Sequence, residues 1–581
     1  MNALKTTAIL AGFLGLLSLQ AEEARHPFSV DLRHTYFSRR ESWMTLYPTE
    51  QAATLRYYFA RMYNTRGEWL DLTFLQGGKA RPVAFAASAS ELSIRAGGEG
   101  APSARAYFVG PLDTVVDGRG FDLRIGAVKE GLDLATSRME TPGQIAFESE
   151  GWTCRIEVKQ GRAEREGKGW VLRAVDGRLR VAFRLFRGQA PAPLAVDPDH
   201  DVAAIQKGWE SWRAKMPAVA PERTHMAETA WWNLWSLYAP KDDVFVTPAV
   251  LEAKAHMNSE WPWDHCFVAQ ALGMADLDAA LDEFMIPFAN MDAKGQLPDR
   301  MLPDEIYRGA SKPPIHGWTL MQLMKRHAFT QAQLERVYGP LVKWTEFWFA
   351  QRDLDQNGLP AYGGEHSGWE SGWDNATVLG NPKAKYESPD LQAYLVLQMK
   401  ALGHIAGLLG KAEEAKRWET RAVAHQKLLM KELWNGQSFT VREEATHAAK
   451  TDSACLLPYM PLILGEHLDK AVFNRLADDL EARFLTPFGP ATEAPTSPAY
   501  TPDGYWRGPI WGPTTFILVD GLARGGRKDL AREIARRFSD MVQRVGGHYE
   551  NYDALTGQPL CCKGYAWTAA VDLLFAHDYL R

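Results

Sequence analysis

The hydrophobic pattern of the chain changes its period once, near residue 198, and this change constrains the fold more than any single motif. Between residues 26 and 198, apolar and polar residues alternate in short runs such as LDLTFL, CRIEVKQ and LRVAFRLF, which is typical of half-buried strands. From residue 221 onward, apolar residues recur at helical spacing in about twelve stretches. We therefore expect a multidomain chain, with an N-terminal β-sandwich (26–198), a linker helix (199–220) and an all-α domain (221–581).

The helical part is expected to close on itself. About twelve helices pair into six hairpins, which favours an (α/α)6 barrel. Two of the expected helical stretches are 453–464 and 506–522. The longest irregular joins are 294–315, 353–387, 486–505 and 546–563. Long loops at alternate joins face one end of such a barrel, so we expect them to form a cleft.

The N-terminus resembles an export signal. Lys5 is followed by an apolar stretch, residues 6–19, and by small residues with Ala21 as the cleavage point. A signal peptide over 1–21 predicts a periplasmic or secreted protein, and an uncleaved anchor is the alternative. The apolar stretch is short for a membrane span, so no membrane association is expected after cleavage.

Charge and cysteine usage exclude several classes of protein. The net charge is −6 without long runs of one sign, which argues against a nucleic-acid partner. Five cysteines (Cys154, Cys266, Cys455, Cys561 and Cys562) follow neither a disulfide framework nor a zinc pattern. One disulfide bridge is compatible with export, and the sequence indicates neither its partners nor the oligomeric state.

Residues 363–379, GGEHSGWESGWDNATVL, combine two acids with two tryptophans in a glycine-rich segment. Aromatic faces cover the apolar face of a pyranose ring, and carboxylates bind hydroxyls and transfer protons. Glu370, Asp374, Trp369 and Trp373 therefore predict a sugar site. The alternative is a surface loop in which Asp374 caps the start of a helix.

Glycosidic hydrolysis needs a second carboxylate from a distant part of the chain. The segment 546–553, GGHYENYD, is the best source, and Glu550 is preferred to Asp553, which belongs to a separate turn. In YWRGPIW, Arg507 either binds a sugar hydroxyl, orients a carboxylate or forms a cation–π stack. Asp264, after Trp263, either caps a helix or holds a hydroxyl.

One metal pattern is half present. Asp353, Asp355 and Asn357 match the first half of an EF-hand loop, but Gly364 stands where the bidentate Glu belongs. Calcium is thus one interpretation of this segment and a tight turn is the other. We expect that no cofactor is required.

Taken in order, these motifs resemble a known family. Trp263-Asp264, WESGWDN, YWRGPIW, HYENYDALTG and GYAWTAA are similar to the inverting α-glycosidases of glycoside hydrolase family 63 and, more distantly, to family 37 trehalases. The resemblance covers residues 261–574 and implies an (α/α)6 barrel preceded by a β-sandwich. It implies that Asp374 is the general acid and Glu550 the general base. The residues that it implies for substrate binding are Trp263, Asp264, Trp373, Asn375, Trp506, Arg507 and Trp567.

The sequence therefore predicts an exported glycoside hydrolase. It would cleave terminal α-glycosidic bonds, of α-glucosidic type, in an oligosaccharide or small glycoside with inversion. A hydrolase of mannosylglycerate, glucosylglycerate or trehalose is a close alternative. From other classes, the alternatives are a polysaccharide lyase that uses His548, Tyr549 and Tyr552, and a glycan-binding protein without activity.

Overall fold

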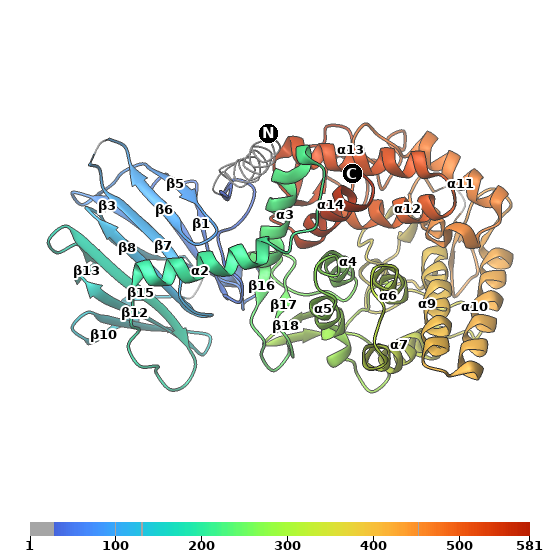
Figure 1. Ribbon diagram of the computed structural model, residues 1–581, viewed down its shortest axis with the longest axis horizontal. Coiled ribbons are helices and arrows are strands. Elements are labelled where there is room, and N and C mark those ends of the chain that lie inside the picture. The colour runs from blue at the N-terminus through green and yellow to red at the C-terminus, as the bar shows by residue number, and fades with distance from the viewer. Residues whose placement is uncertain (1–27, 99, 129–131, 451–452) are drawn as a thin grey trace, which may run out of the picture.

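The protein has a strand-rich N-terminal part and a helical C-terminal part (Figure 1). The computed structural model describes residues 28–98, 100–128, 132–450 and 453–581. Long strands lie before Pro198 and long helices after it, which confirms the predicted order of the two parts. The predicted signal peptide, 1–21, lies outside the described residues.

Two antiparallel sheets make up the N-terminal part. The seven-stranded sheet has the order β1-β2-β3-β9-β14-β13, with β4 paired to β3, and the eight-stranded sheet has the order β10-β11-β12-β15-β8-β7-β6-β5. The strands of the first are β1 (Met44–Pro48), β2 (Thr54–Phe59), β3 (Glu68–Gln76), β4 (Lys79–Ala80), β9 (Asp122–Ala127), β13 (Arg162–Glu166) and β14 (Gly169–Arg173). The strands of the second are β5 (Val83–Ala87), β6 (Leu92–Ala96), β7 (Ser103–Phe108), β8 (Asp113–Arg119), β10 (Arg138–Thr141), β11 (Gln144–Ser149), β12 (Trp152–Gln160) and β15 (Arg178–Phe186).

The inner faces of the two sheets pack together through aromatic side chains. The rings of Tyr57 and Phe183 lie 5.4 Å apart, and those of Phe59 and Trp152 lie 4.9 Å apart. Because β-strand side chains alternate between two faces, the period-2 pattern of the sequence gives each sheet one apolar face for this core.

The C-terminal part consists of helices joined by loops and short strands. Its helices are α2 (Pro198–Arg213), α3 (Thr224–Leu237), α4 (Asp264–Leu272), α5 (Leu277–Ala289), α6 (His316–Arg326), α7 (Gln331–Gln351), α8 (Ser367–Ser371), α9 (Pro389–Leu408), α10 (Ala412–Leu433), α11 (Lys470–Arg483), α12 (Gly512–Arg524), α13 (Lys528–Val545) and α14 (Ala566–Asp578). Its short ladders are β16 (Tyr238–Ala239) with β17 (Ala249–Val250), β18 (Arg300–Leu302) with β19 (Glu305–Tyr307), β20 (Tyr386–Glu387) with β21 (Val441–Glu443) and β22 (Ala449–Lys450), and β23 (Tyr549–Tyr552) with β24 (Pro559–Lys563).

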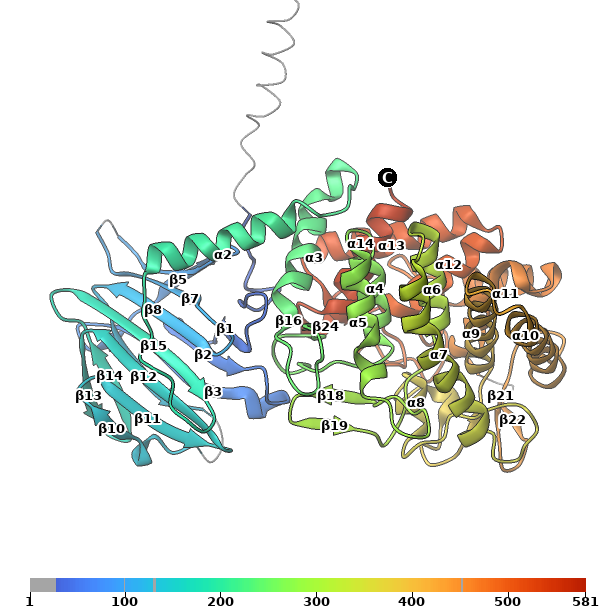
Figure 2. The same ribbon diagram turned by 60° about the horizontal axis from the view of Figure 1, so that its bottom comes forward.

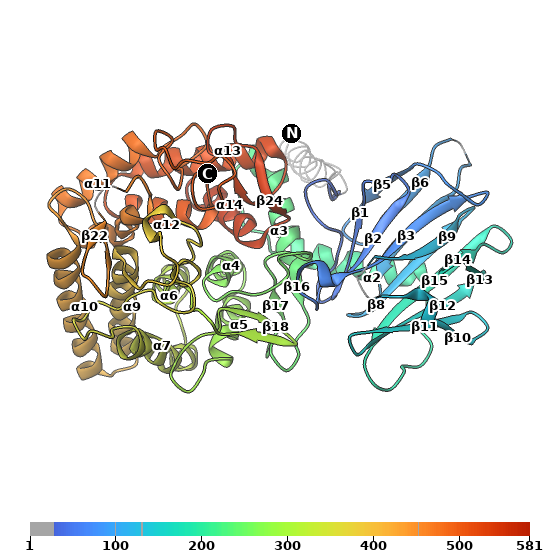
Figure 3. The ribbon, with the colours of Figure 1, turned by 180° about the vertical axis from the view of Figure 1, so that it is seen from behind.

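Helix α2 runs from the sheets to α3 and connects the two parts (Figures 1 and 2). Its Trp212 stacks on Trp231 of α3 with ring centroids 4.5 Å apart. At the other end of the chain, α14 packs against α3 and α4, so the C-terminus returns to the beginning of the helical part (Figure 3).

Two expected helical stretches differ from the structure. Instead of an α-helix over 453–464, a 3-10 helix covers Leu457–His467, because Pro461 inside it has no N–H to donate to a helical hydrogen bond. Residues 506–511 are not helical, and α12 begins only at Gly512. Tyr505 has a φ of 63° and Gly508 a φ of 153°, so the chain cannot continue as a right-handed helix there.

None of the helices that the structure describes combines the length and apolar character needed to cross a bilayer.

Candidate active site

A cavity of about 640 Å³ opens at one end of the helical part, and both parts of the chain line it. Its lining comprises Tyr63, Met257, Trp261, Trp263, Asp264, Asp299, Arg300, Glu305, Tyr307, Lys312, Trp369, Gly372, Asp374, Tyr505, Trp506, Tyr565 and Trp567. Besides Asp374, the sequence predicted five of these residues as part of a sugar site: Trp263, Asp264, Trp369, Trp506 and Trp567.

Buried tryptophans form the floor of the cavity. Trp263 meets Trp567 edge-on with ring centroids 6.0 Å apart, and both are almost fully buried. Trp506 stacks on Trp511, with centroids 4.0 Å apart and planes within 6° of each other. Trp373 supports Trp506 from a centroid distance of 4.8 Å but does not itself line the cavity. This floor offers flat apolar faces of the kind that pack on sugar rings.

Asp374 reaches the cavity because α8 ends abruptly. Gly372 closes that helix with a φ of 73°, a conformation that glycine adopts without strain. The 3-10 helix that follows has Ala376 at its N-cap position and no side-chain cap, so the capping role considered for Asp374 is wrong. Burial raises the pKa of the Asp374 carboxyl, and the nearby Lys312 ammonium opposes this shift.

Glu370, the other acid of the segment 363–379, forms an ion pair outside the cavity. It is fully buried and pairs with Arg352, whose Nη2 lies 2.8 Å from Oε1. The backbone N–H of Gly364 donates to Oε2 at 2.8 Å. Glu370 therefore holds the loop that precedes α8 and does not face the cavity.

Glu550 lies on β23, close to the Tyr505 loop. Ile510 and Tyr552 exchange backbone hydrogen bonds of 2.7 and 3.0 Å, which joins the two segments. The Tyr505 hydroxyl donates to Glu550 Oε1 at 2.8 Å. Burial raises the pKa of Glu550 to about 7, and the charge of Asp374 contributes to the rise. Glu550 is not among the residues that line the cavity, but its carboxylate interacts electrostatically with that of Asp374.

Three further polar groups complete the cavity, of which the sequence singled out only Asp264. Lys312 forms an ion pair with Asp299, 3.0 Å from Nζ to Oδ1, and donates to the Trp369 carbonyl at 2.6 Å. Asp264 is the first residue of α4 and makes no capping bond, and its buried Oδ2 has no hydrogen-bond partner among the described residues. An unpartnered buried carboxylate oxygen in a cavity is a ready acceptor for a ligand hydroxyl.

Besides Trp373, two predicted binding residues lie outside the lining. Asn375 uses its amide to join loops: Nδ2 donates to the Gly504 carbonyl at 3.0 Å, and Oδ1 accepts from the Trp506 N–H at 2.9 Å. This bridge positions Trp506 in the floor. Arg507 has an exposed side chain and is not among the residues that line the cavity.

The residues of the lyase alternative are engaged in structural contacts. His548 is fully buried and lies 3.2 Å from both Asn233 Nδ2 and Asp572 Oδ2. The Tyr552 hydroxyl donates to the Gly547 carbonyl at 2.9 Å, and Tyr549 contacts His34 at 2.9 Å. None of these three lines the cavity.

Residues 353–358, the predicted calcium segment, form a turn in which N–H groups of the segment donate hydrogen bonds to its own carboxylates. Asn357 Nδ2 donates to Asp355 Oδ2 at 2.8 Å, and the Gly358 N–H donates to Asp353 Oδ2 at 3.1 Å. These two hydrogen bonds are those of an Asx-rich turn. The arrangement fits the tight-turn interpretation, and we assign no ion to it.

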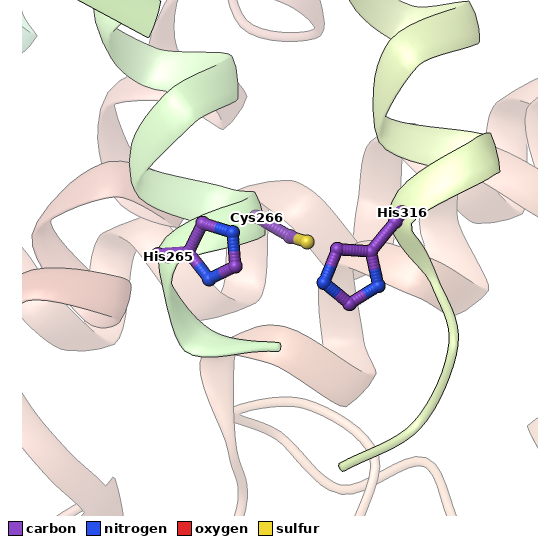
Figure 4. Close-up of side chains that lie close together, drawn as sticks. All are labelled: His265, Cys266 and His316. Atoms are coloured by element: carbon purple, nitrogen blue, oxygen red, sulfur yellow. The ribbon is translucent and has the colours of Figure 1, made fainter. Parts of the chain in front are cut away.

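A second group of potential ligands lies buried beneath the cavity, where His265, Cys266 and His316 converge (Figure 4). Trp344 Nε1 donates to His316 Nδ1 at 3.2 Å, which leaves the proton of a neutral His316 on Nε2. In Figure 4, this Nε2 faces the other two side chains, where an ion would need a lone pair instead. The hydrogen bonding therefore fits a neutral core histidine better than a metal ligand.

A cavity with an indole floor, Asp374 in its lining and Glu550 buried nearby has the groups that a carbohydrate-active hydrolase needs. Residues 257–568, more than half of the chain, match the family described as the mannosylglycerate hydrolase MGH1-like glycoside hydrolase domain, and the chain belongs to this family. It is a glycoside hydrolase by this family.

Individual relatives agree with this assignment. The mannosylglycerate hydrolase of Thermus thermophilus is 23% identical over 410 aligned positions that cover 54% of this chain and 94% of the relative. The glucosylglycerate hydrolase of Mycolicibacterium hassiacum is 24% identical over 421 positions that cover 54% and 90%. A bacterial glucoamylase solved with acarbose has a TM-score of 0.60 at 10% identity and covers 94% of this chain and 93% of its own, which shows a shared fold.

Proposed function

We propose that the protein is an exo-acting α-glycosidase that releases a terminal α-linked sugar, of α-glucosidic type, with inversion. Asp374 acts as general acid and Glu550 as general base. The observation that carries the proposal is the pair of interacting carboxylates, Asp374 in the cavity lining and Glu550 buried beside it, above the indole floor.

The reaction needs only these groups and water. Asp374 gives its proton to the glycosidic oxygen as the bond from C1 to that oxygen breaks, and Glu550 takes a proton from the water that attacks C1 from the opposite face. Inverting enzymes separate the two carboxylates by roughly 6.5–9.5 Å to admit this water, and that separation stays a prediction here. Tyr505 fixes the orientation of Glu550 through its hydroxyl.

The gradient of burial supports exo-action. Trp263, Trp506 and Trp567 at the floor are buried, whereas Trp369 near the opening is 40% exposed. A cavity that is closed at one end accepts the terminal ring of a substrate and leaves the remainder toward solvent. We further propose that the helices close as an (α/α)6 barrel behind a β-sandwich, and that the protein is exported to the periplasm or medium.

A small glycoside is the second candidate substrate class. The aligned relatives are named mannosylglycerate and glucosylglycerate hydrolases, and their alignments cover most of their own length. In that case the same two carboxylates would act on a sugar linked to glycerate.

The proposal is tested with α-glycosyl fluorides and α-linked disaccharides of glucose, mannose and galactose. Fluoride leaves without strong protonation, whereas a sugar oxygen needs an acid. We expect Asp374→Asn to lose at least ~10²-fold in kcat on the disaccharide and to recover most of it on the fluoride. Glu550→Gln should lose at least ~10²-fold on both substrates, because each needs the activated water.

Proton NMR of the first product identifies the stereochemistry. The β-anomer should appear first from the α-substrate. The α-anomer would contradict inversion, and fluoride rescue of Glu550→Gln instead of Asp374→Asn would exchange the two roles.

A further inference from the structure

We propose that the N-terminal sheets complete the leaving-group side of the active site through Tyr63, and that this side selects a neutral sugar over glycerate as leaving group. The inference rests on the proposed function and deepens it. The family match begins at Met257, after both sheets, so Tyr63 is a wall that this chain adds to the family's catalytic segment.

Tyr63 is held in place by a buried clamp. It lies in the loop between β2 and β3, directly before the short 3-10 helix Asn64–Gly67. Asn258 is fully buried and donates from Nδ2 to the carbonyls of Ala60 at 2.7 Å and Met62 at 2.8 Å. Its Oδ1 accepts from the Asn64 N–H at 3.1 Å. One amide thus fixes the loop on both sides of Tyr63.

The β18–β19 hairpin meets the same loop, and Figure 2 shows this hairpin on the side of the helical part that faces the sheets. Asp304, at its turn, pairs with Arg61 at 3.2 Å and with Arg187 at 2.9 Å, both from the strand-rich part. The Arg300 guanidinium on β18 lies 3.9 Å from the centre of the Tyr63 ring. These contacts make Tyr63 and the hairpin one continuous wall.

This wall belongs to the rim and not to the floor. Tyr63 and Tyr307 are only partly buried, and Trp369, 6.5 Å from Tyr307 between ring centres, is exposed. The sugar that is released occupies the buried floor, so the group that leaves lies among these three aromatic rings. Aromatic rings at such a rim favour a second sugar ring, which has an apolar face to stack.

The charged groups along the cavity lining disfavour an anionic leaving group. Arg300 is paired with Glu305, and Lys312 with Asp299. Glu365 adds a further carboxylate, which accepts from the Tyr307 hydroxyl at 2.8 Å. A glycerate carboxylate would face acids whose cations are already paired, whereas a neutral sugar would meet only hydrogen-bonding groups. Arg300 Nη1 has no hydrogen-bond partner among the described residues and can donate to a sugar hydroxyl, while the pairing of the same guanidinium with Glu305 leaves it no net charge to offer a carboxylate.

The test compares three substrates of the sugar that the enzyme accepts: its α-fluoride, an α-linked disaccharide and its α-linked glycerate conjugate. The fluoride has no leaving group that reaches the rim and needs little protonation, so its hydrolysis reports the floor and Glu550 without the rim. We expect the wild type to favour the disaccharide over the glycerate conjugate by at least about tenfold in kcat/KM, the size of one good stacking contact.

Variants at Tyr63 isolate its contribution. Tyr63→Ala should lower the ratio of disaccharide to fluoride kcat/KM by about tenfold, and Tyr63→Phe, which retains the ring, should restore most of that ratio. Thr65→Ala, in the same loop but outside the lining, is the matched control. Retained fluoride hydrolysis by Tyr63→Ala shows that the variant is folded.

The possible outcomes separate the two proposals. Wild-type preference for the glycerate conjugate overturns the selection of a neutral sugar. If Tyr63→Ala lowers kcat/KM equally for the disaccharide and the fluoride, the leaving-group role of Tyr63 is overturned. If the wild type hydrolyses none of the fluorides and none of the disaccharides, the proposed function itself is overturned.

Discussion

Several carboxyl groups of the helical part are buried, and one of them, Asp264, lines the cavity. Glu252, Glu260, Asp264 and Glu283 are each at most 3% exposed, and burial raises the pKa of all four. Desolvation favours the neutral form of such a group, so folding takes up protons at neutral pH. These four acids favour the protonated form in the folded protein, so the free energy of unfolding decreases as the pH rises above neutral.

Glu283 provides a measure of this cost. Its Oε2 accepts from the Val250 N–H at 3.0 Å, and burial raises its pKa to about 8. The pKa of Glu283 is higher in the folded protein than its ordinary value of 4.5. The free energy of unfolding therefore falls as pH rises from about 4.5 to about 8 and is constant above that range. Glu283→Gln should be more stable than the wild type at pH 9, on the order of 3 kcal/mol, and similar to it at pH 5.

Thermal unfolding at the two pH values checks this expectation. Glu533→Gln is the control, because Arg536 and Arg537 lower the pKa of Glu533 to about 2 and its charge does not change between pH 5 and pH 9. It should shift the unfolding temperature equally at both. A pH-independent effect of Glu283→Gln would show that Glu283 is ionised in the folded protein.

Helix α8 shows how one short segment positions the proposed acid. It spans only Ser367–Ser371, yet its left-handed end at Gly372 turns the chain so that Asp374 lines the cavity. A Cβ built on Gly372 would lie 2.7 Å from Trp263 Cζ2, too close for any side chain. The helix end, the acid and the indole floor are therefore fitted to one another.

Gly372→Ala should disturb stability and activity together. The left-handed conformation costs a non-glycine residue about 1–2 kcal/mol, and the contact with Trp263 adds an overpacking cost of about 1–3 kcal/mol. We expect a lower unfolding temperature and at least about a tenfold loss of kcat/KM, since a 1 Å displacement at a reacting group costs this much or more.

The matched control is Gly77→Ala. Gly77 has a φ of 58° but open space around its Cβ position, so alanine there carries the strain without the collision. It should lower the unfolding temperature slightly and leave kcat/KM unchanged. If both variants lost activity equally, backbone strain alone would account for the loss. Our interpretation, that the contact with Trp263 matters, would then be wrong.

Periodicity and local motifs predicted much of this protein, and tertiary contacts account for the rest. Strand and helix periods placed the two parts, whereas Pro461 and the left-handed Tyr505 altered helices that apolar spacing alone predicted. Asp374 and Trp263 stood out because their motifs are continuous in sequence. The sequence around Tyr63 contains no such motif. Tyr63 is held at the cavity by Asn258, which is distant in sequence, so the contact could not be predicted.

Asp299 and Lys312 occupy an intermediate position. Both lie in the long loop 294–315, which was expected at the cleft, but nothing in the sequence paired one with the other. The ion pair depends on the path of that loop, which propensities do not determine.

Contacts on both sides of the cavity join the two parts of the molecule. Besides the Asn258 clamp, Thr45 Oγ1 donates to the Lys254 carbonyl at 3.0 Å, and Lys563 Nζ donates to the Leu32 carbonyl at 2.8 Å. Figure 1 shows the segment that leads from β15 into α2 as the covalent connection between the parts. The strand-rich part is thus bound to the helical part by much more than its linker.

Cutting the linker should therefore leave the enzyme whole. A protease recognition sequence inserted between Gln189 and Ala190, both exposed, allows cleavage of the folded protein. We expect the two fragments to elute together in size-exclusion chromatography and to keep the kcat/KM of the uncut protein. Separation of the fragments with unchanged disaccharide hydrolysis would show that the sheets are dispensable for the site.

Tyr63 and Trp567 line the same cavity although one lies near the beginning of the chain and the other near its end. A growing polypeptide therefore supplies the wall at Tyr63 about five hundred residues before the indole of Trp567. No nascent chain that stops short of Trp567 contains the whole site, so hydrolysis of glycosidic bonds cannot begin before that residue has been added.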